Sequence, residues 1–426
     1  MSFDALPARP QRIAIVGGGI SGLAAAYLLA PQHTVTLYES EKRLGGHART
    51  VMAGKNGDRA VDTGFIVFNY ANYPHLTRMF RDLDVPVERS DMSFGATIDN
   101  GAVEYGLGDL PALIGQRRNM LRPGFLRMVR DIVKFNAGAE MAARDDAMTI
   151  GDLVSEMKLG NWFDRYYLTP ICGAIWSTPT EEVRAFPART LVQFFRNHAL
   201  LSNSGQHQWW TVSGGSIEYV KRLERHLKTR AVRIRTGSPV RTIIRNGVES
   251  TIHSIGHSPE TFDQVILACH SDQALRMLET PTKEERAALS AIRYRDNRVV
   301  LHADTSQMPH RRACWSSWVY KADHARPNAA IGVTYWMNRL QNIPEGDPLF
   351  ISLNQIQESP RTLVYDEKTF RHPVFDRAAF LAQDSLKQIQ GMNNTWFAGA
   401  YTRHGFHEDG FASAVRIARQ MDRQFT

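Results

Sequence analysis

The chain has 426 residues, of which 43% are apolar, 10% aromatic and 22% charged. This composition excludes a disordered chain, a collagen-like repeat and a disulfide-stapled mini-protein, and the length allows two domains. Basic residues outnumber acidic ones by 51 to 43, which gives a formal charge of +8. Such a surplus is compatible with contact to anionic membranes or nucleic acid, and equally with a solvated basic surface.

The cysteines are few and far apart: Cys172, Cys269 and Cys314. An odd number at these spacings offers neither a disulfide framework nor a zinc ribbon, so we expect a reducing, cytoplasmic setting and no metal site. The N-terminus lacks the apolar core of a signal peptide, and no stretch approaches the roughly 18 uncharged apolar residues of a membrane span. We therefore expect any membrane contact to be peripheral, at the inner face of the membrane.

Residues 12–50 have the pattern strand, glycine-rich turn, helix, strand: apolar runs over 13–16 and 34–38 flank a helix-type run over 20–29. The turn has the GxGxxG spacing of a dinucleotide site. Its first glycine permits a tight turn, its second lets the backbone approach a pyrophosphate, and its third lets the helix pack on the sheet. Free N–H groups at the helix start would hold the phosphate. The residues expected to contact the cofactor here are Gly17, Gly19, Ile20, Ser21 and Gly22.

Glu39 ends the second strand-type run, and Ser40 follows it. A carboxylate at this position can accept hydrogen bonds from both ribose hydroxyls and would repel a 2′-phosphate. The chain continues with Arg43, Gly45, Gly46 and His47. This RxGG segment resembles the second motif of the flavin amine oxidase superfamily, in which it lies beside the cofactor. The resemblance implies non-covalently bound FAD, with Arg43 at the diphosphate and the two glycines near the ribityl chain and flavin.

The resemblance also implies the architecture. We expect an α/β fold in which a Rossmann-like FAD-binding domain of the glutathione-reductase type, with amine oxidase topology, is interleaved with an α+β substrate domain. The FAD-binding domain would comprise residues 1–70, 208–290 and 391–426, and the substrate domain residues 71–207 and 291–390. Further cofactor contacts are expected at Thr63 and Gly64, and at the backbone of Val240 beside the adenine, where a core strand is the alternative.

The C-terminal segment departs from the superfamily pattern. Relatives have an acidic residue directly after the strand glycine, but here Ala400 follows Gly399. Glu408 or Asp409 would substitute, by capping the following helix or by reaching the ribityl chain. Backbone N–H groups near Gly410 and Phe411 would stabilise negative charge on the flavin.

Several longer phrases narrow the resemblance to FAD/NAD(P)-binding proteins associated with cyclopropane fatty acid synthases: VDTGFIVFN at 61–69, AIWS at 174–177, TYWMNRLQ at 334–341 and GFHEDG at 405–410. This resemblance implies a fatty acyl or phospholipid acyl substrate, and a cyclopropane fatty acid synthase-type enzyme as a partner. No nucleic-acid recognition motif accompanies the basic charge, so we expect no nucleic-acid partner.

Classical amine oxidases of the superfamily carry a lysine near the flavin on a substrate-domain strand. The comparable strand here, 298–303, has no lysine and offers His302 instead, which favours chemistry on a carbon chain over oxidation of an amine. We regard His302, His198 and His404 as candidate acid or base groups, with a core or surface role as the alternative for each. Trp176, Tyr335 and Trp336 are candidate walls of an acyl pocket, with core packing as the alternative.

These observations predict an FAD-dependent oxidoreductase that removes hydride from an acyl chain, or changes its double bonds, next to flavin N5. Three alternatives remain open: a flavin amine oxidase, a redox-neutral FAD-dependent fatty acid isomerase, and a non-catalytic flavin-bearing subunit of a lipid-modifying enzyme. Residues 110–146 combine helix-type apolar positions with seven basic side chains, which fits either a helix lying on anionic lipid or a helix packed on its own domain.

Overall fold

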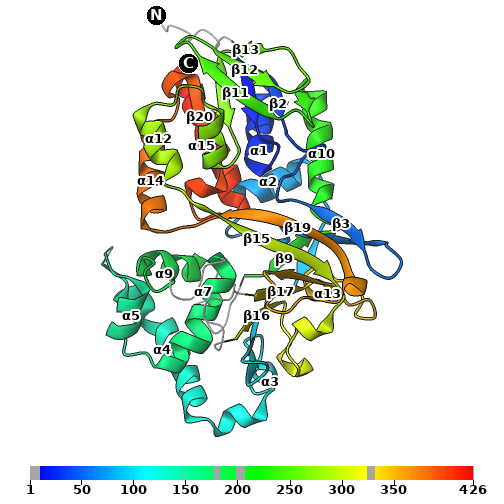
Figure 1. Ribbon diagram of the computed structural model, residues 1–426, viewed down its shortest axis with the longest axis vertical. Helices are drawn as coiled ribbons and strands as arrows, with labels where there is room; N and C mark the ends of the chain where they lie inside the picture. The colour runs from blue at the N-terminus through cyan, green and yellow to red at the C-terminus, as the bar shows by residue number, and fades with distance from the viewer. Residues whose placement is uncertain (1–9, 146, 177–182, 198–206, 324–331, 426) are drawn as a thin grey trace, which may run out of the picture.

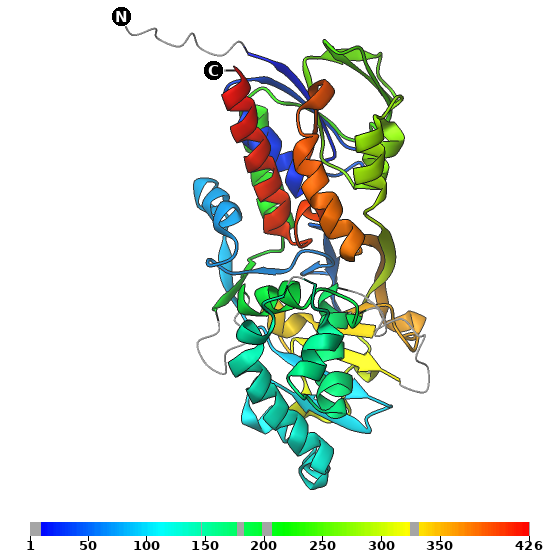
Figure 2. The same cartoon turned by 90° about the vertical axis from the view of Figure 1, so that its left-hand side faces the viewer.

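The computed structural model describes residues 10–145, 147–176, 183–197, 207–323 and 332–425. They form two lobes, and the first and last of them lie in the same, upper lobe (Figures 1 and 2). The α/β fold expected from the sequence is confirmed, with a parallel Rossmann-like sheet in the upper lobe.

The upper lobe is built on a five-stranded sheet with the order β10-β2-β1-β14-β20, in which every pairing is parallel. Its strands come from three separate stretches of the chain. Ile13 and Ile15 face one side of the sheet and Ala14 and Val16 the other, and all four are buried, as expected for a parallel sheet covered on both faces. The strands are β1 (Arg12–Val16), β2 (Thr34–Tyr38), β10 (Arg233–Arg235), β14 (Gln264–Leu267) and β20 (Thr395–Phe397).

Helices cover both faces of this sheet. On the face of Ile13 and Ile15 lie α1 (Ile20–Leu29), α2 (Pro74–Asp82), α10 (Ile217–Thr229) and α15 (His407–Phe425). On the other face lie α11 (Ser271–Met277), α12 (Lys283–Ser290), α14 (Arg377–Gln388) and a three-stranded sheet of β11 (Val240–Arg245), β12 (Ser250–Ser254) and β13 (Glu260–Phe262).

The lower lobe contains a seven-stranded sheet, order β19-β15-β18-β17-β16-β7-β8, which is antiparallel except for the pair β16–β7. Its strands are β7 (Phe94–Ile98), β8 (Val103–Gly106), β15 (Tyr294–His302), β16 (Trp318–Ala322), β17 (Gly332–Trp336), β18 (Phe350–Leu353) and β19 (Val364–Pro373). Its helical part consists of α3 (Leu110–Leu113), η1 (Arg117–Leu121), α4 (Pro123–Ala142), α5 (Ile150–Glu156), α6 (Asn161–Phe163), η2 (Asp164–Leu168), α7 (Thr169–Trp176) and α9 (Ala188–Asn197); α13 (Met337–Leu340) follows β17.

The lobes are joined by β15 and β19, which pair with each other from Tyr294–Pro373 to His302–Val364 and cross from one lobe into the other (Figure 1). Between the lobes also lie a hairpin of β3 (Thr50–Ala53) and β4 (Arg59–Asp62) and a small sheet of β5 (Val67–Phe68), β9 (Trp209–Val212) and β6 (Val87–Ser90).

The structure differs from the expected domain boundaries at two helices. α2 packs against α15, and α14 packs against α12, so both lie on the upper lobe although residues 71–207 and 291–390 were assigned to the substrate domain. The apolar faces of these helices complete the packing around the parallel sheet, which a boundary placed by motif position alone does not reveal.

Candidate functional site

The glycine turn between β1 and α1 has no room for a side chain at Gly17 or Gly22. Gly17 has φ +113°, and a Cβ on Gly22 would lie 1.8 Å from the carbonyl oxygen of Gly17. A Cβ on Gly17 itself would lie 2.6 Å from the carbonyl oxygen of Ala268, at the end of β14. The first residue before α1, Gly19, has no side chain to cap the helix, so the N–H groups of Ile20 and Ser21 are available to an anion.

Glu39 lies against this turn. Its Oε2 accepts a hydrogen bond from the N–H of Gly18 (2.6 Å), and its Oε1 accepts from the N–H of Glu41 (2.7 Å) and from the Ser40 hydroxyl (3.0 Å). A carboxylate has about four acceptor sites, so Glu39 can bind further hydroxyl groups from this position. The structure thus brings Glu39 and Ser40 to the glycine turn, where a ribose would lie.

The segment after Glu39 crosses in front of the turn. Gly45 donates its N–H to the carbonyl oxygen of Gly18 (2.8 Å), and Gly45 and Gly46 have φ of +109° and +57°. Arg43 donates to the carbonyl oxygens of Leu44, Gly46 and Ala48 and pairs with Glu41 (3.0 Å). Arg43 therefore braces its own loop in this structure, whereas the sequence predicted a contact with a diphosphate.

The N-termini of α1 and α15 meet beside this loop. A Cβ on Gly410 would lie 2.8 Å from Oγ of Ser21 and 2.9 Å from Cγ2 of Ile20. Gly399 donates its N–H to Oγ of Ser413 (3.0 Å), which fixes the end of β20 to α15, and Phe411 is buried. Both helix ends carry partial positive charge, so the arrangement favours an anionic or electron-rich group between them.

The two acids of the C-terminal turn bind the protein's own backbone. Glu408 accepts hydrogen bonds from the N–H groups of His75 and Leu76, both 3.0 Å long, at the start of α2. Asp409 accepts from the N–H groups of His404 (3.2 Å) and Phe406 (3.0 Å). Glu408 thus caps α2 and Asp409 holds the turn before α15, and a contact of either carboxylate with the ribityl chain stays a prediction.

Three histidines meet where the glycine loop, the end of β14 and β19 come together, and we call them the junction histidines: His47, His270 and His372. The ring centroid of His47 lies 6.0 Å from that of His270 and 5.4 Å from that of His372. Burial, together with the neighbouring His47, lowers the pKa of His270 to about 4 and that of His372 to about 3. Burial also lowers the pKa of His47, so the neutral form of each ring is favoured.

Several polar atoms at this junction are buried and have no partner: Nε2 of His47, Nδ1 of His270 and Oη of Tyr401. Buried polar atoms in folded proteins are normally satisfied, so these point to a polar ligand. Together with the glycine turn, the two helix N-termini and the Glu39 carboxylate, they fit a long dinucleotide with phosphates, hydroxyls and polar ring edges.

His407 and His75 lie beside this region, and neither was expected there from the sequence. The ring of His407 stacks on Phe65 with centroids 3.9 Å apart, and Tyr219 Oη lies 2.6 Å from its Nε2. Burial lowers the pKa of His407 to about 3. His75 stacks on Phe411 at the next turn. The sequence could have identified His407, because it lies within the GFHEDG motif, which was already expected to lie at the cofactor.

The remaining predicted residues lie as follows. Thr63 donates from its hydroxyl to the carbonyl oxygen of Arg49 (3.2 Å), and a Cβ on Gly64 would lie 2.0 Å from the carbonyl oxygen of His47, so both pack against the glycine loop. Val240 begins β11 and packs against the core on the other face of the sheet. Its contact with adenine stays a prediction.

The candidate acid–base histidines are not brought together. His302 is fully buried; its Nε2 lies 2.8 Å from Oγ of Ser352, and its Nδ1 accepts the N–H of Asp304. Neither nitrogen is left for a substrate, so His302 is a core residue of β15 in this structure. His404 lies in the turn before α15, where burial lowers its pKa. His198 lies outside the described residues.

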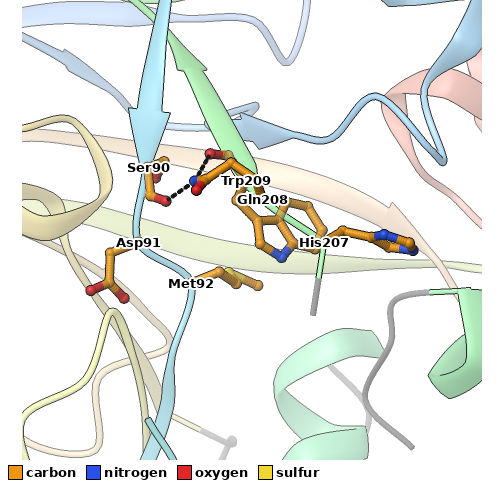
Figure 3. Close-up of a pocket in the computed structure, with 6 residues that line it drawn as sticks. All are labelled: Ser90, Asp91, Met92, His207, Gln208 and Trp209. Carbon is orange, nitrogen blue, oxygen red and sulfur yellow. Dashed lines mark hydrogen bonds between the residues drawn. The ribbon is translucent and has the colours of Figure 1, made fainter. Parts of the chain in front are cut away.

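An open cavity of about 320 Å³ lies between the ends of β6 and β9 (Figure 3). Gln208 spans it, donating to the carbonyl oxygens of Ser90 (3.1 Å) and Trp209 (2.7 Å). Met92, Trp318 and Tyr335 are partly buried apolar side chains packed on the same core, and the rings of Trp318 and Tyr335 are in edge contact at 4.8 Å. Trp336, by contrast, is a core residue that binds Asn338. The lining is Ser90, Asp91, Met92, His207, Gln208 and Trp209.

Comparison with known proteins identifies the family. Residues 20–303 match the model of the flavin-containing amine oxidoreductases. An L-amino-acid oxidase of Bothrops pauloensis is 51% identical over 49 residues, a segment that spans 11% of this chain and 10% of that relative. The chain thus matches only about a tenth of the length of these curated relatives.

Solved structures share the fold over nearly the whole chain. A protein of Exiguobacterium with a protoporphyrinogen oxidase assignment has a TM-score of 0.72 at 16% identity, covering 97% of this chain and 99% of that one. A conjugated linoleic acid-producing fatty acid isomerase of P. acnes has a TM-score of 0.66 at 15% identity and covers both chains completely. A UDP-galactopyranose mutase has a TM-score of 0.69 at 14% identity, over 98% and 96% of the two chains.

Proposed function

The chain belongs to the flavin-containing amine oxidoreductase family, whose members bind FAD, and we propose that it is an FAD-dependent oxidoreductase acting on the acyl chain of a fatty acid or phospholipid. The FAD is bound without a covalent link, because the cysteines Cys172, Cys269 and Cys314 lie outside the C-terminal FAD segment. The glycine turn, Glu39 and the helix N-termini of α1 and α15 would hold it.

The hydrogen bonds of the buried acids favour an acyl substrate over an amine. Each buried carboxylate among the described residues accepts at least one hydrogen bond from the protein, so none is a buried, unpaired charge that would require the ammonium group of an amine. These residues are Asp62, Glu104, Asp131, Asp164, Glu285, Asp304, Asp347, Glu408 and Asp409.

The walls toward the lower lobe suit an apolar substrate. Met92, Phe94, Trp210, Trp318 and Tyr335 are partly buried apolar side chains packed around the core that also contains Phe68 and Trp209. An acyl chain gains about 0.8 kcal/mol for each methylene it buries against such a surface. These five side chains bind by shape and apolar area, and the carboxylate that lines the cavity beside Met92, Asp91, is already paired with Arg339.

When bound, FAD supplies a two-electron acceptor for a hydride from the substrate carbon. The protein's part is to orient the chain, exclude water and receive the accompanying proton. The unpartnered Nε2 of His47 and Nδ1 of His270 are the nitrogens of the junction histidines that can accept this proton where the cofactor leaves them free, although their lowered pKa makes them weak bases. They replace His302 as the candidate bases.

The second candidate is a redox-neutral isomerisation of a double bond. It is favoured by the shared fold with a protein named as a fatty acid isomerase, and by the same neutral bases, which can both remove and return a proton. Amine oxidation, the activity in the family's name, is disfavoured by the occupied carboxylates. A cyclopropane fatty acid synthase-type enzyme, acting on the same class of acyl chain at the inner face of the membrane, is the proposed partner; a purely accessory role beside it is the remaining alternative.

Product analysis separates these functions. The flavin-loaded protein is incubated with phospholipids, free fatty acids and primary amines, each with and without a quinone as electron acceptor, and the products are examined by mass spectrometry. The proposal predicts acyl products lighter by two hydrogens and dependent on the acceptor. Products of unchanged mass with a moved double bond would establish isomerisation, products from amines alone would establish amine oxidation, and absence of any product would leave the accessory role; each overturns the proposal.

A further inference from the structure

The surface furthest from the chain termini carries an unusual collection of exposed apolar side chains. The described residues contain sixteen large apolar side chains that are exposed, and seven of them fall between residues 110 and 141. They lie on α3, η1 and α4, at the lower end of the molecule (Figures 1 and 2). We call this set the tip face: Leu110, Ile114, Met120, Leu121, Leu126, Val133 and Met141.

The fold does not need these side chains. The inner face of α4 already fills the lobe with Phe125, Met128, Phe135 and Ala139, all of them fully buried. Leu126, Val133 and Met141 recur on the opposite side of the helix, and Leu121 is 86% exposed. α4 therefore has two apolar faces, and among the residues that the structure describes only one of these faces has a partner.

The charge around the tip face is positive. Residues 110–146 hold seven basic and four acidic side chains, and one of the acids, Asp131, is buried and accepts the N–H of Gly160. Arg127 and Arg130 pair with Asp131 but stay exposed. Arg117 makes no hydrogen bond or ion pair within the described chain, and Arg118 and Arg122 donate to the carbonyl oxygens at 101–102.

We propose that the tip face docks on the surface of an anionic lipid bilayer, with its leucine, isoleucine, methionine and valine side chains below the phosphates and the surrounding arginines on them. Arginine suits this position because its stem can lie along apolar surface while the guanidinium binds phosphate. No helix of the described residues is long and apolar enough to cross a membrane, so the contact is peripheral. The docking does not depend on which reaction the protein catalyses.

A vesicle assay tests the docking. The full chain, loaded with FAD, is sedimented with vesicles of phosphatidylglycerol and phosphatidylcholine, or of phosphatidylcholine alone, at low and high salt. The wild type is expected to bind the anionic vesicles and to be released by salt. Arg117→Ala should weaken binding about fivefold, the effect of one basic residue at an anionic surface, and Leu121→Glu should weaken it about tenfold or more, because it places a charge in the apolar layer.

Two matched variants at the other lobe serve as controls. Val248 is 80% exposed on the turn between β11 and β12, and Arg286 is exposed on α12. Val248→Glu and Arg286→Ala make the same chemical changes and should leave vesicle binding unchanged. All four variants should keep the wild-type FAD content and melting temperature, because none of the four side chains is buried.

Each outcome of the vesicle assay either supports the docking proposal or contradicts it. Loss of anionic-vesicle binding in the tip variants alone supports the proposal. Failure of the wild type to bind anionic vesicles, or equal losses in tip and control variants, overturns it. If the wild type instead self-associates in solution and Leu121→Glu makes it monomeric without any vesicle binding, the tip face is a protein interface and the membrane proposal is wrong.

Discussion

Oε2 of Glu39 accepts a hydrogen bond from the N–H of Gly18 over 2.6 Å, which ties the end of β2 to the glycine turn before α1. The bond holds the Glu39 carboxylate beside a turn that has no room for a side chain at Gly17 or Gly22. This hydrogen bond places the Glu39 carboxylate where it can bind a ribose of FAD in the proposed site.

Replacing that carboxylate should weaken cofactor binding. Glu39→Gln keeps the size of the side chain but removes the charge that would bind two ribose hydroxyls, and hydrogen bonds to charged groups contribute about 1.5–3 kcal/mol. We expect the dissociation constant of FAD to rise about tenfold to a hundredfold, measured by titration of the apoprotein. Glu140→Gln, an exposed acid on α4, is the control and should bind FAD as the wild type does. Unchanged FAD affinity in Glu39→Gln would place the adenosine elsewhere.

A methyl group at the third glycine should abolish the site. Gly22→Ala would place its Cβ 1.8 Å from the carbonyl oxygen of Gly17, so either the turn or α1 must shift. We expect a protein without bound flavin, or one that melts well below the wild type. Gly346→Ala is the matched control, since no atom lies within 4 Å of the added group. Wild-type flavin content in Gly22→Ala would contradict the close packing of α1 on the turn.

The acid that caps α2 should make stability depend on pH in a defined direction. Burial raises the pKa of Glu408 to about 7, from an ordinary value of 4.5. Between those values the unfolded chain has lost the proton that the folded chain retains, so this residue makes folding less favourable as the pH rises from 4.5 to 7. Glu408→Gln cannot titrate. The melting temperature of the wild type minus that of the variant should therefore fall across this range.

A difference that stays constant or grows with pH would show that Glu408 is ionised throughout in the folded protein. Asp152→Asn is a suitable control, because Asp152 is an exposed acid whose hydrogen bonds to Thr149 lower its pKa instead. Its linkage has the opposite sign and acts below pH 4.

The junction histidines predict a loss of stability on acidification. Burial lowers the pKa of His270 to about 4, below the ordinary 6.5, so between these values the unfolded state binds the proton that the folded state rejects. This contribution is complete above pH 6.5 and is lost as the pH falls toward 4. His270→Gln should flatten that part of the melting profile, whereas His310→Gln, an exposed histidine, should not. Equal profiles for the wild type and His270→Gln would contradict the neutral cluster.

Much of the upper lobe could be predicted from the sequence, because its signals are local. The apolar runs, the three glycines and the acid at Glu39 each force one conformation, and the structure places them together. The packing of α2 and α14 could not be predicted in this way. Their neighbours, α15 and α12, are distant in the chain, and an amphipathic helix does not reveal which lobe covers its apolar face.

The candidate site, too, could be predicted from the sequence only where the signal is local. His302 was chosen for its place on a strand, but only the folded structure shows that Ser352 and the backbone of Asp304 occupy its ring nitrogens. The junction histidines come from three segments, at positions 47, 270 and 372, with no common spacing to reveal them. Glu408 and Asp409 were expected in the turn before the last helix, but that helix begins at His407 and includes both in its first turn. Their hydrogen-bond partners are set by how that turn meets α2, which no local pattern encodes.

The most direct test of the account is anaerobic reduction of the bound flavin. The purified, FAD-loaded protein is mixed in the absence of oxygen with phospholipid vesicles, free fatty acids or primary amines, and the visible absorbance of the oxidised flavin is followed. An acyl lipid is expected to bleach the flavin, and amines are expected to leave it oxidised. Bleaching by amines and by no lipid would contradict the proposed function.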